Sequence, residues 1–279
     1  MTKIPNAITF DIEDYFHAFT SRNIPVKKKY LDYKDKGTNN LLKILKNCKI
    51  KATFFVLGDY AKKHPDLIRK ITENGHEIGV HSYKHINLRN LSAKEFKKDL
   101  GKAKRTVEKI TGEKVLGYRA PFFSFDEKNQ EYTKAFTDLG FAYDSSTNPI
   151  LKALHGHPGY NPRFHEVSIN NSKFTELPLA SFPIFGHNLP WAGGFYFRLM
   201  PYYIFKLGLR YINNIRGPSV LYLHNWEFDP NQPKIPGKLS VKFFHYVGLS
   251  TTRKKLEKLS KNFKLMPIRD LCKEIKLKL

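Results

Sequence analysis

The feature of this sequence that most constrains its fold is a regular alternation of short apolar runs with amphipathic helical segments. The run AITFDI at 7–12 precedes a helical pattern at 38–50, and the pair recurs as KATFFVLG at 51–58 and a helical pattern at 64–75. Strands that alternate with helices in this way are typical of parallel sheets with crossover helices. The alternation therefore predicts an α/β fold built on a parallel sheet.

The alternation continues towards the C-terminus with one long interruption. Ser92 and Glu95 stand in capping-box register at the start of the next helical pattern, which Gly112 closes. Further strands are expected at 76–81, 114–123 (with an exit loop), 141–146 and 219–228, and further helices at 126–140, 200–217 and 251–263. A short strand and helix are expected at 264–275. From 147 to 190 the pattern breaks into Pro, Gly, His and Asn, with one expected strand at 173–180, and such irregular chain predicts binding loops.

The chain is strongly basic, with 48 Lys and Arg against 25 Asp and Glu and a formal net charge of +23. This balance favours anionic partners such as nucleic acid, an acidic lipid surface or an acidic polysaccharide, although a general lysine-rich bias explains it as well. Because the sequence holds no recognisable nucleic-acid-binding motif, no nucleic-acid partner is expected. Peripheral contact with an anionic membrane surface stays open.

No segment reads as a signal peptide or a membrane span. The start MTKIPNAITF lacks a long apolar stretch, and no run approaches the ~20 apolar residues that a span needs. A cytoplasmic location is therefore expected. Cys48 and Cys272 fit neither a metal pattern nor a disulfide framework and are expected to be buried thiols.

Two clusters of acid and imidazole follow apolar runs. Asp11, Glu13 and Asp14 place three carboxylates in four residues, which is costly unless a cation or a basic side chain offsets their repulsion. His81 and His85 lie four apart where another expected strand ends. Two imidazoles with one carboxylate form a known catalytic zinc set that leaves coordination positions open. The pattern predicts a divalent metal bound by both histidines and by one of the acids.

Further reactive side chains also end expected strands. Arg119 is by itself most simply a surface residue, yet beside Asp11 its guanidinium would keep that carboxylate ionised. His224 closes the run SVLYLH, where a lone histidine is usually a core residue. The carboxyl ends of parallel barrel strands form one face, and that face carries the active site. The residues expected at these ends are Asp11, His81, Arg119, Asp144 and His224.

Five short motifs in residues 9–224 resemble, in order, those of the polysaccharide deacetylases of carbohydrate esterase family 4, the NodB-homology family. They read TFDIED, HSYKH, RAPF, YDSS and YLH. The resemblance implies a distorted (β/α) barrel of the polysaccharide deacetylase type with a long irregular insertion. It also implies metal-dependent removal of N-acetyl groups from amino sugars of a bacterial polysaccharide or its precursor, with zinc as the expected ion.

The C-terminal half resembles one subgroup of that family. The stretches ELPLASF, AGGFYFRLMPY, HNWEFDPNQP and HYVGLSTTRKKLEKL are similar to the subgroup found with bacterial exopolysaccharide loci, which carries a C-terminal extension. The resemblance implies a single domain over 1–279 with its motif core in 1–150. The remaining 151–279 would hold the insertion loops, the last catalytic strand and the extension.

The resemblance assigns a role to each motif residue. Asp11 would be the base, Arg119 would hold it, and His81 and His85 would bind the metal. The third ligand would be Glu13 or Asp14, because the usual T-F-D-D-G has become F-D-I-E-D. The backbone N–H of Phe122, after Pro121, would stabilise the oxyanion, and His224, oriented by Asp144, would protonate the leaving amine. The aromatic residues expected as sugar-stacking walls, or else as core, are Trp226, Trp191, Phe195 and Tyr196.

Three other functions compete with this one. Relatives on the same fold open cyclic amides, so a hydrolase of a non-sugar cyclic amide is the nearest alternative. A nucleic-acid binder rests on net charge alone, and an inactive glycan-binding module is disfavoured because every catalytic position is filled.

Overall fold

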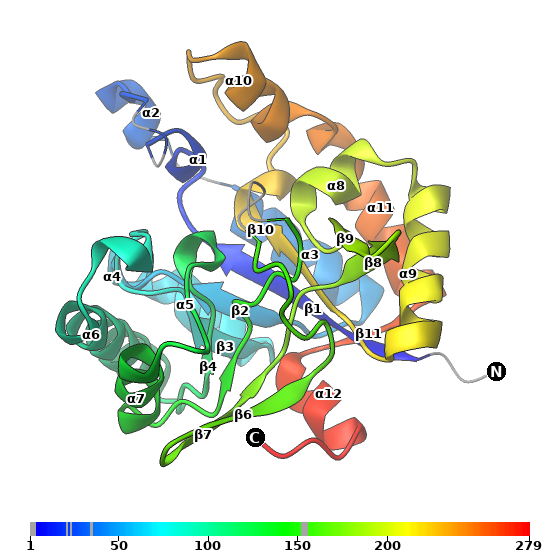
Figure 1. Ribbon diagram of the computed structural model, residues 1–279. Helices are drawn as coiled ribbons and strands as arrows, with labels where there is room; N and C mark the ends of the chain where they lie inside the picture. The colour runs from blue at the N-terminus through cyan, green and yellow to red at the C-terminus, as the bar shows by residue number, and fades with distance from the viewer. Residues whose placement is uncertain (1–3, 21, 23, 34–35, 152–155) are drawn as a thin grey trace.

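The centre of the molecule is a mainly parallel sheet (Figure 1). The computed structural model describes residues 4–20, 22, 24–33, 36–151 and 156–279. Among these residues, nine strands join in the order β10-β1-β2-β3-β4-β5-β7-β6, with β11 also paired to β1. The strands are β1 (Pro5–Ile12), β2 (Thr53–Val56), β3 (Glu77–Val80), β4 (Gly117–Tyr118), β5 (Tyr143–Asp144), β6 (His165–Ile169), β7 (Ser172–Glu176), β10 (Val220–His224) and β11 (Lys264–Met266).

The two sides of this sheet meet just after β7. Leu179 forms a parallel bridge with Val220 of β10, and the Ala180 N–H donates to the Val220 carbonyl at 3.0 Å. On the other side, β7 pairs with β5 at Tyr143 and Thr175. The strands therefore close around an interior, and the distorted barrel expected from the sequence is confirmed.

Helices cover the outside of the barrel, as the alternating pattern predicts (Figure 1). The capping box of Ser92 and Glu95 is present at the start of α6, and Gly112 ends that helix at φ 72°. The helices are α1 (His17–Thr20), α2 (Lys28–Leu31), α3 (Gly37–Cys48), α4 (Gly58–Lys63), α5 (Pro65–Glu73), α6 (Ala93–Thr111), α7 (Gln130–Asp138), α8 (Gly194–Leu199), α9 (Tyr202–Arg216), α10 (Leu239–Tyr246), α11 (Leu249–Asn262) and α12 (Ile268–Glu274). No helix formed by the described residues is both long and apolar enough to cross a bilayer.

Two apolar clusters hold these elements together. The larger one fills the barrel and the space under its helices, and it includes Phe10 and Phe54, whose ring centroids lie 5.4 Å apart. Every residue of β1 after Pro5 is buried, as expected for a strand covered on both faces. The smaller cluster contains Tyr15, Phe19 and Trp226 and seats α10 against α1.

The expectation of an irregular stretch at 147–190 is confirmed for the described residues before β6, while 152–155 lie outside the described residues, and it is wrong for 165–190, which contains more strands than the one expected at 173–180. The segment contains the antiparallel pair β6 and β7 and a second hairpin of β8 (Ser181–Ile184) and β9 (His187–Pro190). The β8–β9 turn consists of Phe185 and Gly186, both at positive φ (43° and 76°), as a two-residue type I′ hairpin requires. The usual Asn-Gly signal is missing because phenylalanine occupies the first turn position.

Candidate active site

The carboxyl ends of β1, β3 and β10 meet at a pocket of about 240 Å³. The register of β1 with β10 sets Asp11 directly opposite His224, so two residues more than 200 positions apart become neighbours. His81 and His85 follow the end of β3. The residues of interest that line the pocket are Asp11, Glu13, His81, His85, Phe122, His224, Trp226 and Glu227.

Arg119 lies beneath this pocket and is completely buried, so the simpler view of it as a surface residue is wrong. Its Nη1 contacts Asp11 Oδ1 at 2.9 Å and donates to Thr9 Oγ1 at 2.7 Å. Its Nε and Nη2 donate to the carbonyl and the hydroxyl of Ser145, each at 2.9 Å. The guanidinium therefore fixes the Asp11 carboxylate from below, as expected from the sequence.

Glu13, His81 and His85 form a cluster in which one ligand atom of each lies within 4.8 Å of the others. His81 Nδ1 lies 2.7 Å from the Arg119 carbonyl oxygen. Because a carbonyl can only accept, Nδ1 carries the proton and Nε2 of His81 is left as a ligand atom. Burial lowers the pKa of His85 to about 3 and that of His81 below its ordinary value, so both imidazoles are neutral near pH 7.

The donor set of this cluster fits a divalent metal. Glu13 Oε2 lies 3.1 Å from His85 Nε2 and 3.4 Å from His17 Nδ1. Yet this buried oxygen makes no hydrogen bond to any residue that the structure describes. A carboxylate and two neutral imidazoles are zinc ligands in catalytic sites. Asp14, the other candidate acid, is half-buried outside the cluster, and burial raises its pKa.

His17 is a neighbour of this cluster that follows the three carboxylates in the sequence but received no role in the sequence analysis. Its ring stacks on His85 at a centroid distance of 5.3 Å and an interplanar angle of 6°. His17 begins α1 four residues after Glu13, so helical spacing was the signal that could have found it.

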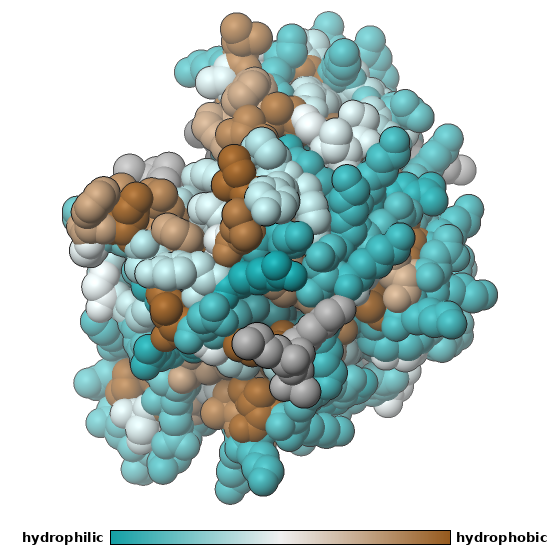
Figure 2. All heavy atoms as spheres, turned by 90° about the vertical axis from the view of Figure 1, so that its right-hand side faces the viewer, coloured by the Kyte–Doolittle hydropathy of each residue, from teal (hydrophilic) through white to brown (hydrophobic). Residues whose placement is uncertain are grey.

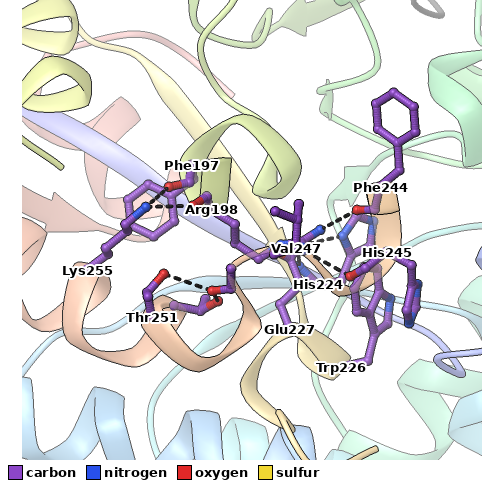
Figure 3. A network of polar contacts seen from close by, with 12 residues as sticks. Phe197, Arg198, His224, Trp226, Glu227, Phe244, His245, Val247, Thr251 and Lys255 are labelled. Carbon is purple, nitrogen blue, oxygen red and sulfur yellow. Dashed lines mark hydrogen bonds and ion pairs between the residues drawn. The ribbon is translucent and has the colours of Figure 1, made fainter. Parts of the chain in front are cut away.

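His224 is held by Glu227, three residues further along the chain (Figure 3). Its Nδ1 and its backbone N–H both lie 2.9 Å from Glu227 Oε1. Glu227 Oε2 in turn accepts a 2.7 Å bond from Arg198 Nε. Burial lowers the pKa of His224, but the bond to Glu227 and the nearby carboxylates outweigh burial and raise it overall.

Arg198 connects this pair to α10. Its remaining N–H groups donate to the backbone carbonyls of Phe244, His245 and Val247 (Figure 3). The guanidinium is thus buried with hydrogen bonds on all sides, and it supplies the positive charge that the buried Glu227 needs.

Asp144 does not orient His224, contrary to the expectation from the family motif. Its carboxylate accepts from the backbone N–H and the hydroxyl of Ser146 at 2.9 and 2.7 Å. It is also register partner of Glu176 across β5 and β7, so the two carboxyls face each other. Burial raises the pKa of Asp144 to about 6, and burial with the neighbouring Asp144 raises the pKa of Glu176 well above its ordinary value.

The two tryptophans are not free sugar platforms. Trp226 lines the pocket, but its ring stacks on His224 and His245 at interplanar angles of 19° and 17°, and its Nε1 lies 3.3 Å from Glu13 Oε1. Trp191 lies in the core against Phe182, and it donates to a backbone carbonyl of α9. The expected sugar-binding role is therefore wrong for Trp191. Phe195 and Tyr196 do line the pocket, as half-buried rings.

The wall that follows β4 has unusual backbone geometry. Phe122 has φ 56°, a conformation that is strained for an aromatic residue and that clusters at functional sites. Its ring packs edge-on against His85 at a centroid distance of 4.6 Å. Pro121 precedes it as a buried residue that starts a short 3₁₀ turn behind the pocket.

Comparison with known proteins relates this geometry to a family. A family model described as polysaccharide deacetylase matches residues 5–143, and a second, described as a domain of unknown function (DUF3473), matches residues 145–273. Peptidoglycan-N-acetylmuramic acid deacetylase PdaA of Bacillus subtilis is 32% identical over 181 residues, which cover 58% of this chain and 68% of that protein. The chain belongs to the polysaccharide deacetylase family.

Two other curated proteins match over shorter stretches. A peptidoglycan-N-acetylglucosamine deacetylase of Bacillus cereus is 32% identical over 114 residues, or 40% of this chain and 42% of that protein. An uncharacterised Geobacillus stearothermophilus protein is also 32% identical, over 50% of this chain and 58% of its own length. This chain thus spans about half the length of these two relatives.

The solved structures of the family extend the likeness to the whole fold. A Mycobacterium smegmatis structure assigned to the polysaccharide deacetylases superposes with a TM-score of 0.65 at 20% identity, covering 98% of this chain and 91% of that one. A mutant of the peptidoglycan deacetylase PdaC of Bacillus subtilis gives 0.53 at 16% identity, covering 99% and 96%.

Proposed function

We propose that this chain is a metal-dependent hydrolase that removes N-acetyl groups from amino sugars of a bacterial polysaccharide or its precursor. The observation that carries the proposal is the cluster of Glu13, His81 and His85, which shares its pocket with the neighbouring residues Asp11 and His224. Amide hydrolysis needs a base for water, stabilisation of an oxyanion and an acid for the leaving amine. In this proposal, side chains around the pocket act as base and acid, and the backbone N–H of Phe122 stabilises the oxyanion.

The proposed metal ligands are Glu13, His81 and His85, with Zn²⁺ as the expected ion. When bound, a divalent ion supplies Lewis acidity and lowers the pKa of a bound water towards about 7. Asp11 then accepts the proton of the attacking water, while Arg119 keeps the carboxylate in place through its 2.9 Å contact.

Two further residues of the pocket, Phe122 and His224, act on the oxyanion and on the leaving group in this proposal. The backbone N–H of Phe122 is the proposed oxyanion donor, and one such preorganised donor contributes about 3 kcal/mol. His224 gives a proton to the departing amine from Nε2, because its Nδ1 is engaged with Glu227. Since Nε2 also lies 3.8 Å from Glu13 Oε1, the acid stands beside the proposed metal ligand.

The proposed machinery draws on both segments that match family models. Glu13, His81 and Arg119 come from 5–143, whereas His224 and Glu227 come from 145–273. This division supports the proposal that residues 1–279 act as a single catalytic domain, in which the C-terminal segment supplies the acid and its partner.

A substrate panel tests this function directly. Acetate and free amine would be quantified after incubation of the zinc-loaded chain with N-acetylated oligosaccharides, O-acetylated sugars and cyclic imides. The proposal predicts equal amounts of acetate and amine from an N-acetylated sugar and no imide ring opening above background. Faster opening of an imide, with no acetate from any sugar, would favour the cyclic amide hydrolase instead.

A further inference from the structure

One face of the molecule exposes an apolar band that the proposed reaction does not explain. We define this band by residues of the β8–β9 hairpin, the outer side of α9 and α10, namely Phe185, Leu189, Tyr203, Leu207, Leu239 and Phe243, all of which are exposed. Phe185, Leu239 and Tyr203 are 95%, 81% and 64% accessible. Figure 2 looks onto the side where α9 lies, and it shows apolar side chains from the upper edge to the centre and on a lobe at the left.

The exposure of Phe185 is built into the hairpin. Its φ of 43° lies in a region that aromatic residues rarely adopt, so a Gly or Asn in this turn would be less strained. Neither packing nor turn geometry therefore accounts for the phenylalanine. A function for the exposed ring is the simplest physical reason for its presence.

The charge around the band has a single sign. Between Glu176 and Glu227 the sequence contains no Asp or Glu, and none occurs between Asp229 and Glu257. Both acids in the middle of this stretch are buried, with Glu227 at 0% and Asp229 at 2% exposure. Apart from the buried Arg198, the basic residues of the same stretch are Lys206, Arg210, Arg216, Lys234, Lys238, Lys242, Arg253, Lys254 and Lys255. The segment that carries the band, residues 177–256, therefore contributes no exposed acid that would repel an anionic surface.

The band also adjoins the mouth of the pocket. α10 contributes Val241 and Phe244 to the pocket wall and presents Leu239 and Phe243 to solvent. Phe195 of α8 packs against Phe244 with centroids 4.4 Å apart, so the rim of the pocket and the band are continuous.

From these observations we infer that the apolar band docks on an anionic lipid bilayer. Aromatic and aliphatic side chains with basic neighbours are the chemistry that binds the headgroup region of such a membrane. The band would insert its apolar side chains while the surrounding Lys and Arg meet the lipid phosphates. If the proposed function also holds, docking would bring a membrane-attached glycan to the pocket mouth beside α10.

Vesicle binding by the whole chain tests the inference without any need for turnover. The probes are sedimented vesicles of phosphatidylcholine alone and of equal parts phosphatidylcholine and phosphatidylglycerol. The inference predicts at least about tenfold stronger partitioning onto the anionic vesicles, and weaker binding as salt rises from about 0.1 M to about 1 M.

Two variants locate the contact. Leu239→Ser with Phe243→Ser is expected to lower partitioning onto anionic vesicles at least about tenfold, and Lys238→Glu with Lys242→Glu is expected to do the same. The matched control is Leu31→Ser with Leu279→Ser, which changes two exposed leucines outside the band and should leave binding unchanged. Thermal unfolding and acetate release from a soluble substrate should match wild type in the serine variants.

Several results would overturn the inference. Equal partitioning onto both kinds of vesicle, or wild-type binding by the serine and the glutamate variants, would show that the band is not a lipid contact. Chromatography showing an oligomer of wild type that the serine variant dissolves would assign the face to a second copy of the chain. Loss of acetate release with intact vesicle binding would contradict the proposed function but not the docking.

Discussion

At the residue scale, the partner of His224 distinguishes this site from what its motifs predict. The motif YDSS led to Asp144, but the register of β5 turns that carboxyl towards Glu176. Glu227 contacts Nδ1 of His224 instead, and it stands in the sequence directly within HNWEF. The available signal was the capping-box spacing of His224 and Glu227, three residues apart. That spacing alone could not show that Arg198 would neutralise the buried Glu227.

The contrast between two substrates tests whether His224 is the acid. His224→Ala should slow release of a sugar amine by 10²- to 10⁴-fold, because a poor leaving group needs a proton, and should barely affect an activated aryl acetate. Glu227→Gln should show the same selectivity to a smaller extent. Asp144→Asn is the matched control and should show no selectivity. The rates would be compared in parallel with circular dichroism.

A loss by His224→Ala that is equal on both substrates would identify His224 as a core residue. Selective loss in Asp144→Asn, with Glu227→Gln unaffected, would restore the role that the motif assigns to Asp144.

Asp11 offers a separate test, because it contacts Arg119 and is not a member of the metal cluster. Asp11→Asn should lower turnover of an N-acetylated sugar at least about 10²-fold while zinc content and thermal unfolding stay close to wild type. Metal analysis and initial rates on the same preparation measure both. Turnover at the wild-type level would exclude Asp11 as the base.

At the scale of elements, the bounds of long periodic segments were predictable, whereas those of short strands were not. The apolar stripe and capping box of α6 identify the helix from sequence alone. β4 and β5 lie within the strands expected at 114–123 and 141–146, but they contain only two residues each, because their bounds are set by pairing with neighbouring strands that sequence does not reveal. The β8–β9 hairpin was missed because Phe185 occupies a turn position that usually belongs to asparagine or glycine.

The junction of β5 with β7 makes stability depend on pH. Burial and the neighbouring Asp144 keep Glu176 protonated in the folded chain at pH values where an unfolded Glu, with a pKa of about 4.3, has released its proton. This contribution is present below the unfolded pKa and is lost as pH rises through the raised pKa of Glu176.

Glu176→Gln replaces the protonated carboxyl with an amide that does not titrate. The loss of stability with rising pH should therefore be smaller in this variant. Above the unfolded Glu pKa, the free energy of unfolding of the variant relative to wild type should rise by up to about 1.4 kcal/mol per pH unit, as measured by urea unfolding. Glu166→Gln, an exposed change on β6, is the control and should follow wild type. The same pH dependence of the unfolding free energy in Glu176→Gln and wild type would mean that the pKa of Glu176 is not raised in the folded chain.

At the scale of the whole molecule, the barrel brings together residues from both ends of the chain. The alternation of strands and helices predicts that Asp11, His81 and His224 share one face, and the closed sheet gathers them at one pocket. The choice between Glu13 and Asp14 could not be made from sequence. Both residues follow the end of β1, and which of their side chains turns towards the imidazoles depends on the backbone there. Only Glu13 of the two lies among the imidazoles.

Metal content and acetate release, measured together on wild type, Glu13→Gln and Asp14→Asn, test the central claim most directly. The account predicts one divalent ion per chain and acetate release from an N-acetylated oligosaccharide for wild type and Asp14→Asn, and loss of both in Glu13→Gln. Retention of the ion and of acetate release by Glu13→Gln, or loss of both in Asp14→Asn alone, would contradict it.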